Sequence, residues 1–145
     1  MTAPTDPFDL ERFVQAQDAG GTYDRALAEL HRGHKSSHWM WFVFPQIAGL
    51  GSSPMAQRYA IGSLDEARAY LDHPVLGPRL VDCCHAALAT DMVRAVAIFG
   101  SIDAIKLRSS MTLFARADPD EPVFGQVLDR FYAGRPDPAT DELLG

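Results

Sequence analysis

Apolar residues recur every three or four positions along most of the chain, which is the spacing of one face of an amphipathic helix. The clearest case runs from Thr22, where a helix can open, to Gly33, which suits a left-handed C-cap. The pattern therefore predicts an all-α fold, a compact bundle of about seven to eight short helices with irregular connections. Further helices are expected after Asp6-Pro7, over 63–71, 78–89 and 91–99, from Ser101, and over 118–132.

Helix-start signals support this reading. Asp6-Pro7 and Asp118-Pro119 each place a side-chain acceptor before a proline whose φ suits the first helical position. Ser53-Pro54 has the same form, and Ser63 with Glu66 three residues later forms a capping-box pattern. No linker divides the chain, so residues 1–145 are expected to be one domain, with about 1–5 and 135–145 as peripheral tails.

The segment from Trp39 to Phe44 is apolar at every position, and its periodicity fits a buried helix and a buried strand equally well. No second strand-like run exists elsewhere in the sequence. A lone strand would leave its backbone groups unpaired, so a helix is favoured.

Composition narrows the classes of function. Hydrophobic residues make up 47% of the 145 positions, enough for one core, and the net charge of −6 disfavours nucleic acid and anionic lipid as partners. No apolar run approaches the length of a membrane span, and the N-terminus does not resemble an export signal, so a cytoplasmic protein is expected. Cys83 and Cys84 are adjacent, which favours reduced core residues over a disulfide.

Residues 31–46 hold three of the five histidines, one of the two lysines and both tryptophans. A helix that opens at Ser36 or Ser37 would present backbone N–H groups beside Lys35 and His38, an arrangement suited to an anion. The alternative is that the serines only cap a buried aromatic helix while Lys35 lies in solvent.

The second lysine begins a polar interruption of an apolar helix. Lys106, Arg108, Ser109 and Ser110 would line a cleft opposite Lys35 in one interpretation. In the other, the hydroxyl groups bond to the carbonyls of the preceding turn and have a structural role.

Metal and cofactor sites are not expected. His31, His34 and His38 have helical spacing, but Gly33 interrupts the helix and no nearby acid or cysteine completes a ligand set. The loop 45–54 contains Gly49-Leu50-Gly51 but lacks the third glycine and the βαβ context of a dinucleotide fingerprint.

Several segments carry a resemblance to a known family. They include Lys35-Ser36-Ser37-His38-Trp39-Met40-Trp41-Phe42, Phe44-Pro45-Gln46, Gly49-Leu50-Gly51, His73-Pro74, Phe99-Gly100, and Lys106 to Phe114 with Asp103. In them the chain resembles domain-of-unknown-function family 1810, and its length and arginine-rich composition are similar to the mycobacterial member. The resemblance implies a compact helical fold and no known activity. The label "calpastatin-like" sometimes given to that family does not suit this composition, because calpastatins are disordered.

Two functional hypotheses follow. The first is a small enzyme or ligand-binding protein for an anionic small molecule, with nucleotide derivatives among the candidates and with His38 as acid or base beside Lys35 and Lys106. The second is a non-catalytic protein–protein interaction module, whose partner the sequence does not identify. Convergence of Lys35, His38 and Lys106 on one pocket would favour the first. The ligand-binding residues in that case are Ser36, Ser37, Trp39, Trp41, Gln46, Arg108, Ser109 and Ser110.

Overall fold

The computed structural model describes residues 6–145, which form nine α-helices and one 3-10 helix. Within these residues the only β-type pairing is an isolated parallel bridge between Ile47 and Ile61, so the all-α prediction is confirmed. The tail expected at 1–5 lies outside the described residues. In chain order the helices are α1 Glu11–Asp18, η1 Ala19–Gly21, α2 Thr22–His31, α3 Met40–Val43, α4 Pro54–Arg58, α5 Leu64–Asp72, α6 Leu76–Leu88, α7 Ala95–Ala117, α8 Pro122–Tyr132 and α9 Pro138–Leu144.

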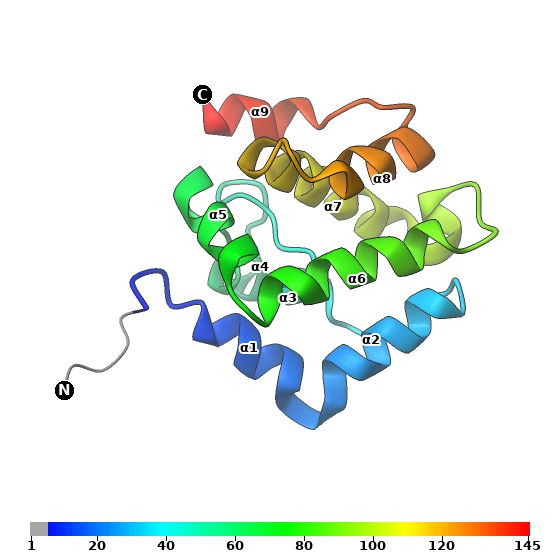
Figure 1. Cartoon of the computed structure of the whole chain (residues 1–145), viewed down its shortest axis with the longest axis horizontal. Coiled ribbons are helices and arrows are strands. Elements are labelled where there is room, and N and C mark those ends of the chain that lie inside the picture. Colours follow the sequence, from blue (N-terminus) through cyan, green and yellow to red (C-terminus); the bar gives the residue numbers. More distant parts are fainter. Residues whose placement is uncertain (1–5) are drawn as a thin grey trace.

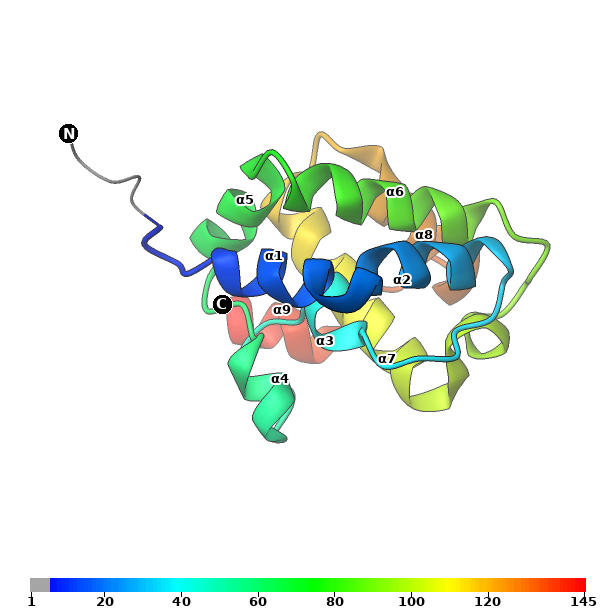
Figure 2. The same ribbon diagram turned by 90° about the horizontal axis from the view of Figure 1, so that it is seen from below.

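The helices lie in three tiers in Figure 1. Helices α1 and α2 follow one another along the bottom, α5 and α6 cross the middle, and α7, α8 and α9 form the top. Direct contacts join these tiers, since α6 packs against both α2 and α8, and α7 packs against α5, α8 and α9. In Figure 2, seen from below, the short helix α4 projects from the body. No helix among residues 6–145 has the length and apolar character that a membrane crossing requires.

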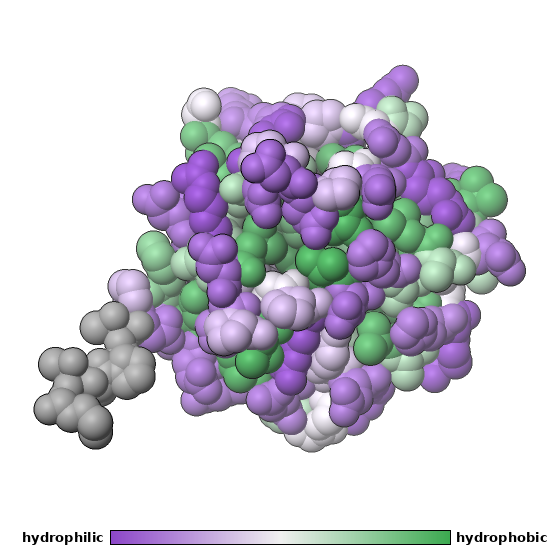
Figure 3. All heavy atoms as spheres, in the orientation of Figure 1, coloured by the Kyte–Doolittle hydropathy of each residue, from purple (hydrophilic) through white to green (hydrophobic). Residues whose placement is uncertain are grey.

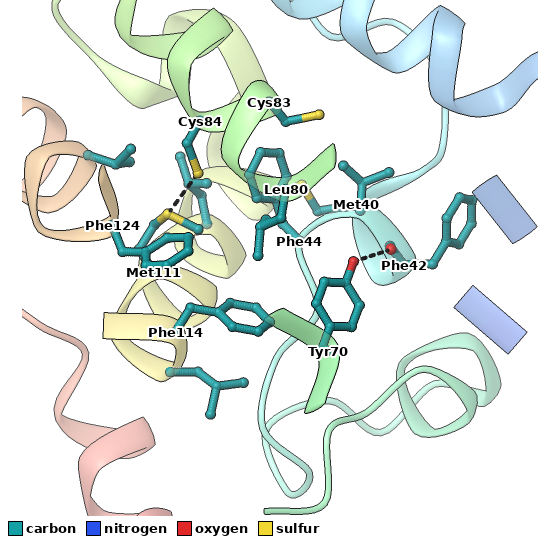
Figure 4. Close-up of a cluster of buried hydrophobic side chains, with 14 of the residues drawn as sticks. Met40, Phe42, Phe44, Tyr70, Leu80, Cys83, Cys84, Met111, Phe114 and Phe124 are labelled. Atoms are coloured by element: carbon teal, nitrogen blue, oxygen red, sulfur yellow. Dashed lines mark hydrogen bonds between the residues drawn. The ribbon is translucent and has the colours of Figure 1, made fainter. Parts of the chain in front are cut away.

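The core is aromatic and continuous between the tiers. Tyr70 and Phe114 pack ring against ring, as do Phe114 and Phe124, and the Tyr70 hydroxyl donates to the carbonyl of Phe42 (Figure 4). Cys84 lies beside Met111 in the same cluster. Burial raises the pKa of Cys83 to about 12, so this thiol is a neutral core group. The face shown in Figure 3 is mainly hydrophilic, with separate apolar patches.

The ambiguous aromatic segment forms a single helical turn, α3, so the preference for a helix is confirmed. Its residues Met40, Phe42 and Val43 are buried. A turn this short leaves carbonyls without helical partners. One of these carbonyls, that of Phe42, accepts a hydrogen bond of 2.8 Å from the side-chain amide of Gln17 on α1.

Two of the helix starts that the sequence predicts agree with the structure, and two do not. Ser53 and Ser63 cap α4 and α5 as expected. The starts at Asp6-Pro7 and Asp118-Pro119 are wrong by several residues. The Asp6 carboxylate accepts from the N–H groups of Leu10 and Glu11, so α1 begins only after an intervening turn. Glu121, not Asp118, provides the acceptor for α8.

Helix α7 contains the expected interruption at Gly100. This residue has φ 81° and ψ 167°, so 95–99 and 101–117 are two helical pieces joined end to end. Lys35 bridges the interruption, since its N–H donates to the carbonyl of Ile98 and its ammonium pairs with Asp103 on the other side. These two contacts of Lys35 therefore stabilise both the kink in α7 and the loop that carries Lys35.

Candidate functional site

The loop between α2 and α3 is folded around the carboxylate of Glu29, which is 1% exposed. The carboxylate accepts from the N–H groups of Ser36 and Ser37 at 2.8 and 3.0 Å, and from the Ser37 hydroxyl. A fourth donor is the indole N–H of Trp39, at 2.9 Å. A helix opening at Ser36 or Ser37 was predicted wrongly, because α3 begins at Met40 and these N–H groups point at Glu29 instead.

These hydrogen bonds keep Glu29 ionised. Burial raises the pKa of the carboxyl group, but the donors from Ser37, Ser36 and Trp39 together outweigh burial and bring the pKa to about 2. The loop thus has the anion-binding character that the sequence suggested. The anion is the protein's own carboxylate, and the backbone donors are occupied by it.

The two lysines of the chain converge on one aspartate. The Lys35 ammonium lies 2.8 Å from Oδ2 of Asp103, and the Lys106 ammonium lies 3.9 Å from Oδ1 of the same side chain. Lys35 also donates to the carbonyl of Ser37. Its side chain is only 6% exposed, whereas that of Lys106 is 25% exposed. Lys106 is therefore the more available of the two positive charges.

Each lysine lies over a tryptophan ring. The ammonium of Lys35 is 4.9 Å from the ring centre of Trp39, and that of Lys106 is 5.3 Å from the ring centre of Trp41. Both distances are within the range of a cation–π interaction. Trp39 is fully buried, while Trp41 is partly exposed. The tryptophans thus position the lysines, and Trp39 also joins the lysine pair to the Glu29 loop.

A pocket of about 320 Å³ opens beside Lys106. Residues 102–109 in the middle of α7 form one wall, the start of α9 another, and the loop after α3 a third. Three of the residues marked in the sequence, Gln46, Lys106 and Ser109, meet here. The full lining is Gln46, Leu50, Gly51, Ile102, Ile105, Lys106, Ser109, Asp137 and Ala139.

Other candidates from the second segment hold the C-terminal helix. The Arg108 guanidinium donates to the carbonyls of Arg135 and Pro136, and the Ser109 hydroxyl donates to Asp137 at 3.0 Å. Ser110 is fully buried, outside the lining of the pocket, and its hydroxyl has no partner within residues 6–145. The segment expected as a peripheral tail is thus helix α9, packed against α7 (Figure 1).

His38 does not line the pocket beside Lys106. Its side chain is exposed, and no hydrogen bond to it is found among the described residues. Nor do three His, Cys, Asp or Glu side chains gather anywhere in residues 6–145 in a way that would hold a metal ion.

Asp103, Asp137 and Glu29 were missed as polar centres of this region. Two of them left a signal in the sequence. Asp103 precedes Lys106 by three residues and shares a helix face with it, and Asp137 stands before Pro138 as a helix start.

The comparisons with known proteins agree with the fold. The family model described as "Protein of unknown function (DUF1810)" matches residues 7–144. The chain belongs to the DUF1810 family. A similar solved structure is that of the conserved hypothetical protein Rv1873 from Mycobacterium tuberculosis, at 51% identity and a TM-score of 0.92, covering 96% of this chain and 98% of that one. No significant match exists among proteins with curated descriptions.

Proposed function

We propose that this DUF1810 protein binds a small organic anion in the pocket beside Lys106. One observation carries the proposal: Lys35 and Lys106 share a single carboxylate, and Lys35 takes the close position at 2.8 Å. The Lys106 ammonium is left with a contact of 3.9 Å and lines a concave surface. A partly desolvated cation without a close counter-ion favours an anionic ligand.

The pocket also offers neutral hydrogen-bonding groups. Within the described part of the chain the backbone carbonyl of Gln46 accepts from Ile61, and its side-chain amide has no hydrogen-bond partner. It can donate to a ligand oxygen beside the ammonium of Lys106. A few polar groups on an otherwise apolar wall are typical of small-molecule sites, where they orient the ligand.

The proposal is binding and not catalysis. His38, the acid or base of the sequence hypothesis, does not line the pocket, and the Lys35 ammonium is engaged by Asp103 and by the carbonyl of Ser37. A general acid or base must reach the reacting atom. We therefore assign Lys35 a positioning role through Asp103 and assign no reaction step to His38.

A thermal-shift screen against organic acids, sugar phosphates and nucleotides tests this function. A ligand at a hundred times its dissociation constant stabilises the fold by about 2.7 kcal/mol, which raises the midpoint by about 5 °C or more for a domain of this size. Lys106→Met should abolish the shift. Arg32→Met is the matched control, because Arg32 is exposed, does not line the pocket, and its side chain makes no hydrogen bond or ion pair within residues 6–145. An equal loss of the shift in both variants would contradict the proposal.

A protein–protein interface is the second candidate. It is favoured by exposed apolar side chains on α7 and just before it, where Val93, Val96, Ile102 and Ile105 are 48–76% exposed. Exposed apolar groups that cluster on one element are a feature of interaction sites. The same screen separates the two candidates, because an interface of this kind predicts no midpoint shift with any small anion.

A further inference from the structure

We infer that the ligand of this pocket is a short aliphatic monocarboxylate, not a phosphate or a nucleotide. The inference rests on the function proposed above and specifies its ligand. It depends on three features of the pocket: the number of positive charges, the hydrogen-bond donors that remain free, and the chemistry of the walls.

The charges favour a ligand with a single negative charge. Lys106 is the only basic residue in the lining, and two carboxylates lie close by, since Asp103 contacts Lys106 and Asp137 lines the pocket. A phosphate dianion would gain one ammonium contact and meet repulsion from both carboxylates. A monocarboxylate has half the attraction and half the repulsion, but it loses much less hydration, because the cost of removing an ion from water rises with the square of its charge.

The free side-chain donors are also too few for a phosphate. Phosphate sites are usually built from several backbone N–H groups at a helix start or a glycine-rich loop. The N–H groups of Ser36 and Ser37 are the obvious set in this region, and Glu29 occupies them. Among the side chains of the lining, the amide of Gln46 and the ammonium of Lys106 remain as donors. Two donors match the two oxygens of one carboxylate.

The walls are aliphatic. Leu50, Ile102, Ile105 and Ala139 line the pocket, and Ile102 and Ile105 are 70% and 67% exposed. A ligand chain laid over these two isoleucines would remove apolar surface from water on both sides, which favours binding. The lining contains no aromatic ring, and the nearest indole, that of Trp41, has Lys106 over its face. The lining of the pocket therefore offers no ring on which a nucleobase could stack.

The volume limits the length of the chain. A pocket of about 320 Å³ is at the lower end of the range of about 300–1,000 Å³ found for small-molecule sites. A short straight or branched acid fits this space, and a long lipid chain does not.

Isothermal titration of the full-length protein with acetate, butyrate, hexanoate, 1-hexanol, inorganic phosphate and AMP tests the inference. Hexanoate should bind at least tenfold more tightly than acetate, 1-hexanol and phosphate. Lys106→Met should weaken hexanoate at least tenfold. The double variant Ile102→Ser, Ile105→Ser should remove the preference for hexanoate, so that this variant binds hexanoate and acetate with equal affinity. All three substituted side chains are partly or largely exposed, so the variants are expected to fold.

The outcomes distinguish this inference from the function it rests on. Tighter binding of phosphate or AMP than of hexanoate, lost in Lys106→Met, overturns the ligand class and leaves anion binding at the pocket intact. Equal affinity for acetate and hexanoate overturns the role of the aliphatic walls. No binding of any anion by the folded wild-type protein overturns the proposed function together with the inference.

Discussion

At the scale of single residues, the buried carboxylate of Glu29 determines how the 34–39 loop folds. Four donors reach it from Ser36, Ser37 and Trp39. Because the loop brings Lys35 to Asp103 as well, the position of the lysine pair depends on Glu29 indirectly. The residues that look most like a binding motif in the sequence thus have an internal partner.

Glu29→Ala should destabilise the protein strongly, by about 3 kcal/mol, because it leaves four buried or partly buried donors without an acceptor. Glu29→Gln keeps the shape and one carbonyl oxygen, so its cost should be about half as large. Urea unfolding of the two variants measures the difference. Equal and small effects would show that the loop does not depend on the carboxylate.

The same residue predicts a dependence of stability on pH. The pKa of Glu29 is about 2 in the folded protein, below its ordinary value of 4.5, so the folded state binds fewer protons. Its contribution is therefore complete above pH 4.5 and is lost as the pH falls from 4.5 to about 2. The free energy of unfolding should decline over this window, by about 1–3 kcal/mol from this group. The decline should be smaller in Glu29→Gln, and an identical pH profile in both proteins would contradict the assignment.

At the scale of elements, the interruption of α7 positions the pocket. Gly100 has a backbone conformation that is essentially restricted to glycine. A Cβ at this position would meet no other atom, so glycine is required for its backbone conformation and not for lack of space. The turn it makes sets the direction of 101–117, which carries Asp103, Lys106 and the isoleucine wall.

Gly100→Ala should cost about 1–3 kcal/mol of stability for this reason. Gly125→Ala is the matched control. Gly125 lies inside α8, has no positive φ and has open space where a Cβ would stand, so alanine should stabilise the protein by about 0.5–1 kcal/mol. Thermal unfolding of the two variants should give midpoint changes of opposite sign. Changes of the same sign would refute the account of α7.

At the scale of the whole molecule, the sequence predicts the fold better than the site. Helix α2 follows directly from its apolar spacing and Gly33, and α3 follows from the lack of a strand partner. Helix α9 carries the signal Asp137-Pro138, the same as Asp6-Pro7, but it is short and polar and its tertiary contacts decide its place.

The site depends on contacts between residues far apart in the chain. Lys35 pairs with Asp103, which is far from it in the sequence, and Gln46 and Ser109 line one pocket because the loop after α3 and the start of α9 both lie against α7. No local pattern encodes such pairs, because spacing along one segment gives only neighbours on that segment. The sequence therefore indicates many residues of this region. It does not show which of them pair with one another inside the protein and which remain available to a ligand.

The central claim is that the pocket beside Lys106 binds an organic anion, and NMR titration of the ¹⁵N-labelled protein with hexanoate tests it most directly. Binding at this pocket predicts chemical-shift changes concentrated at Gln46, Leu50, Gly51, residues 102–109 and Ala139, which saturate with hexanoate and are absent in Lys106→Met. Saturating changes confined to another surface, such as the hollow between α2 and α6 with His31 and His85, would contradict it, as would no change at all.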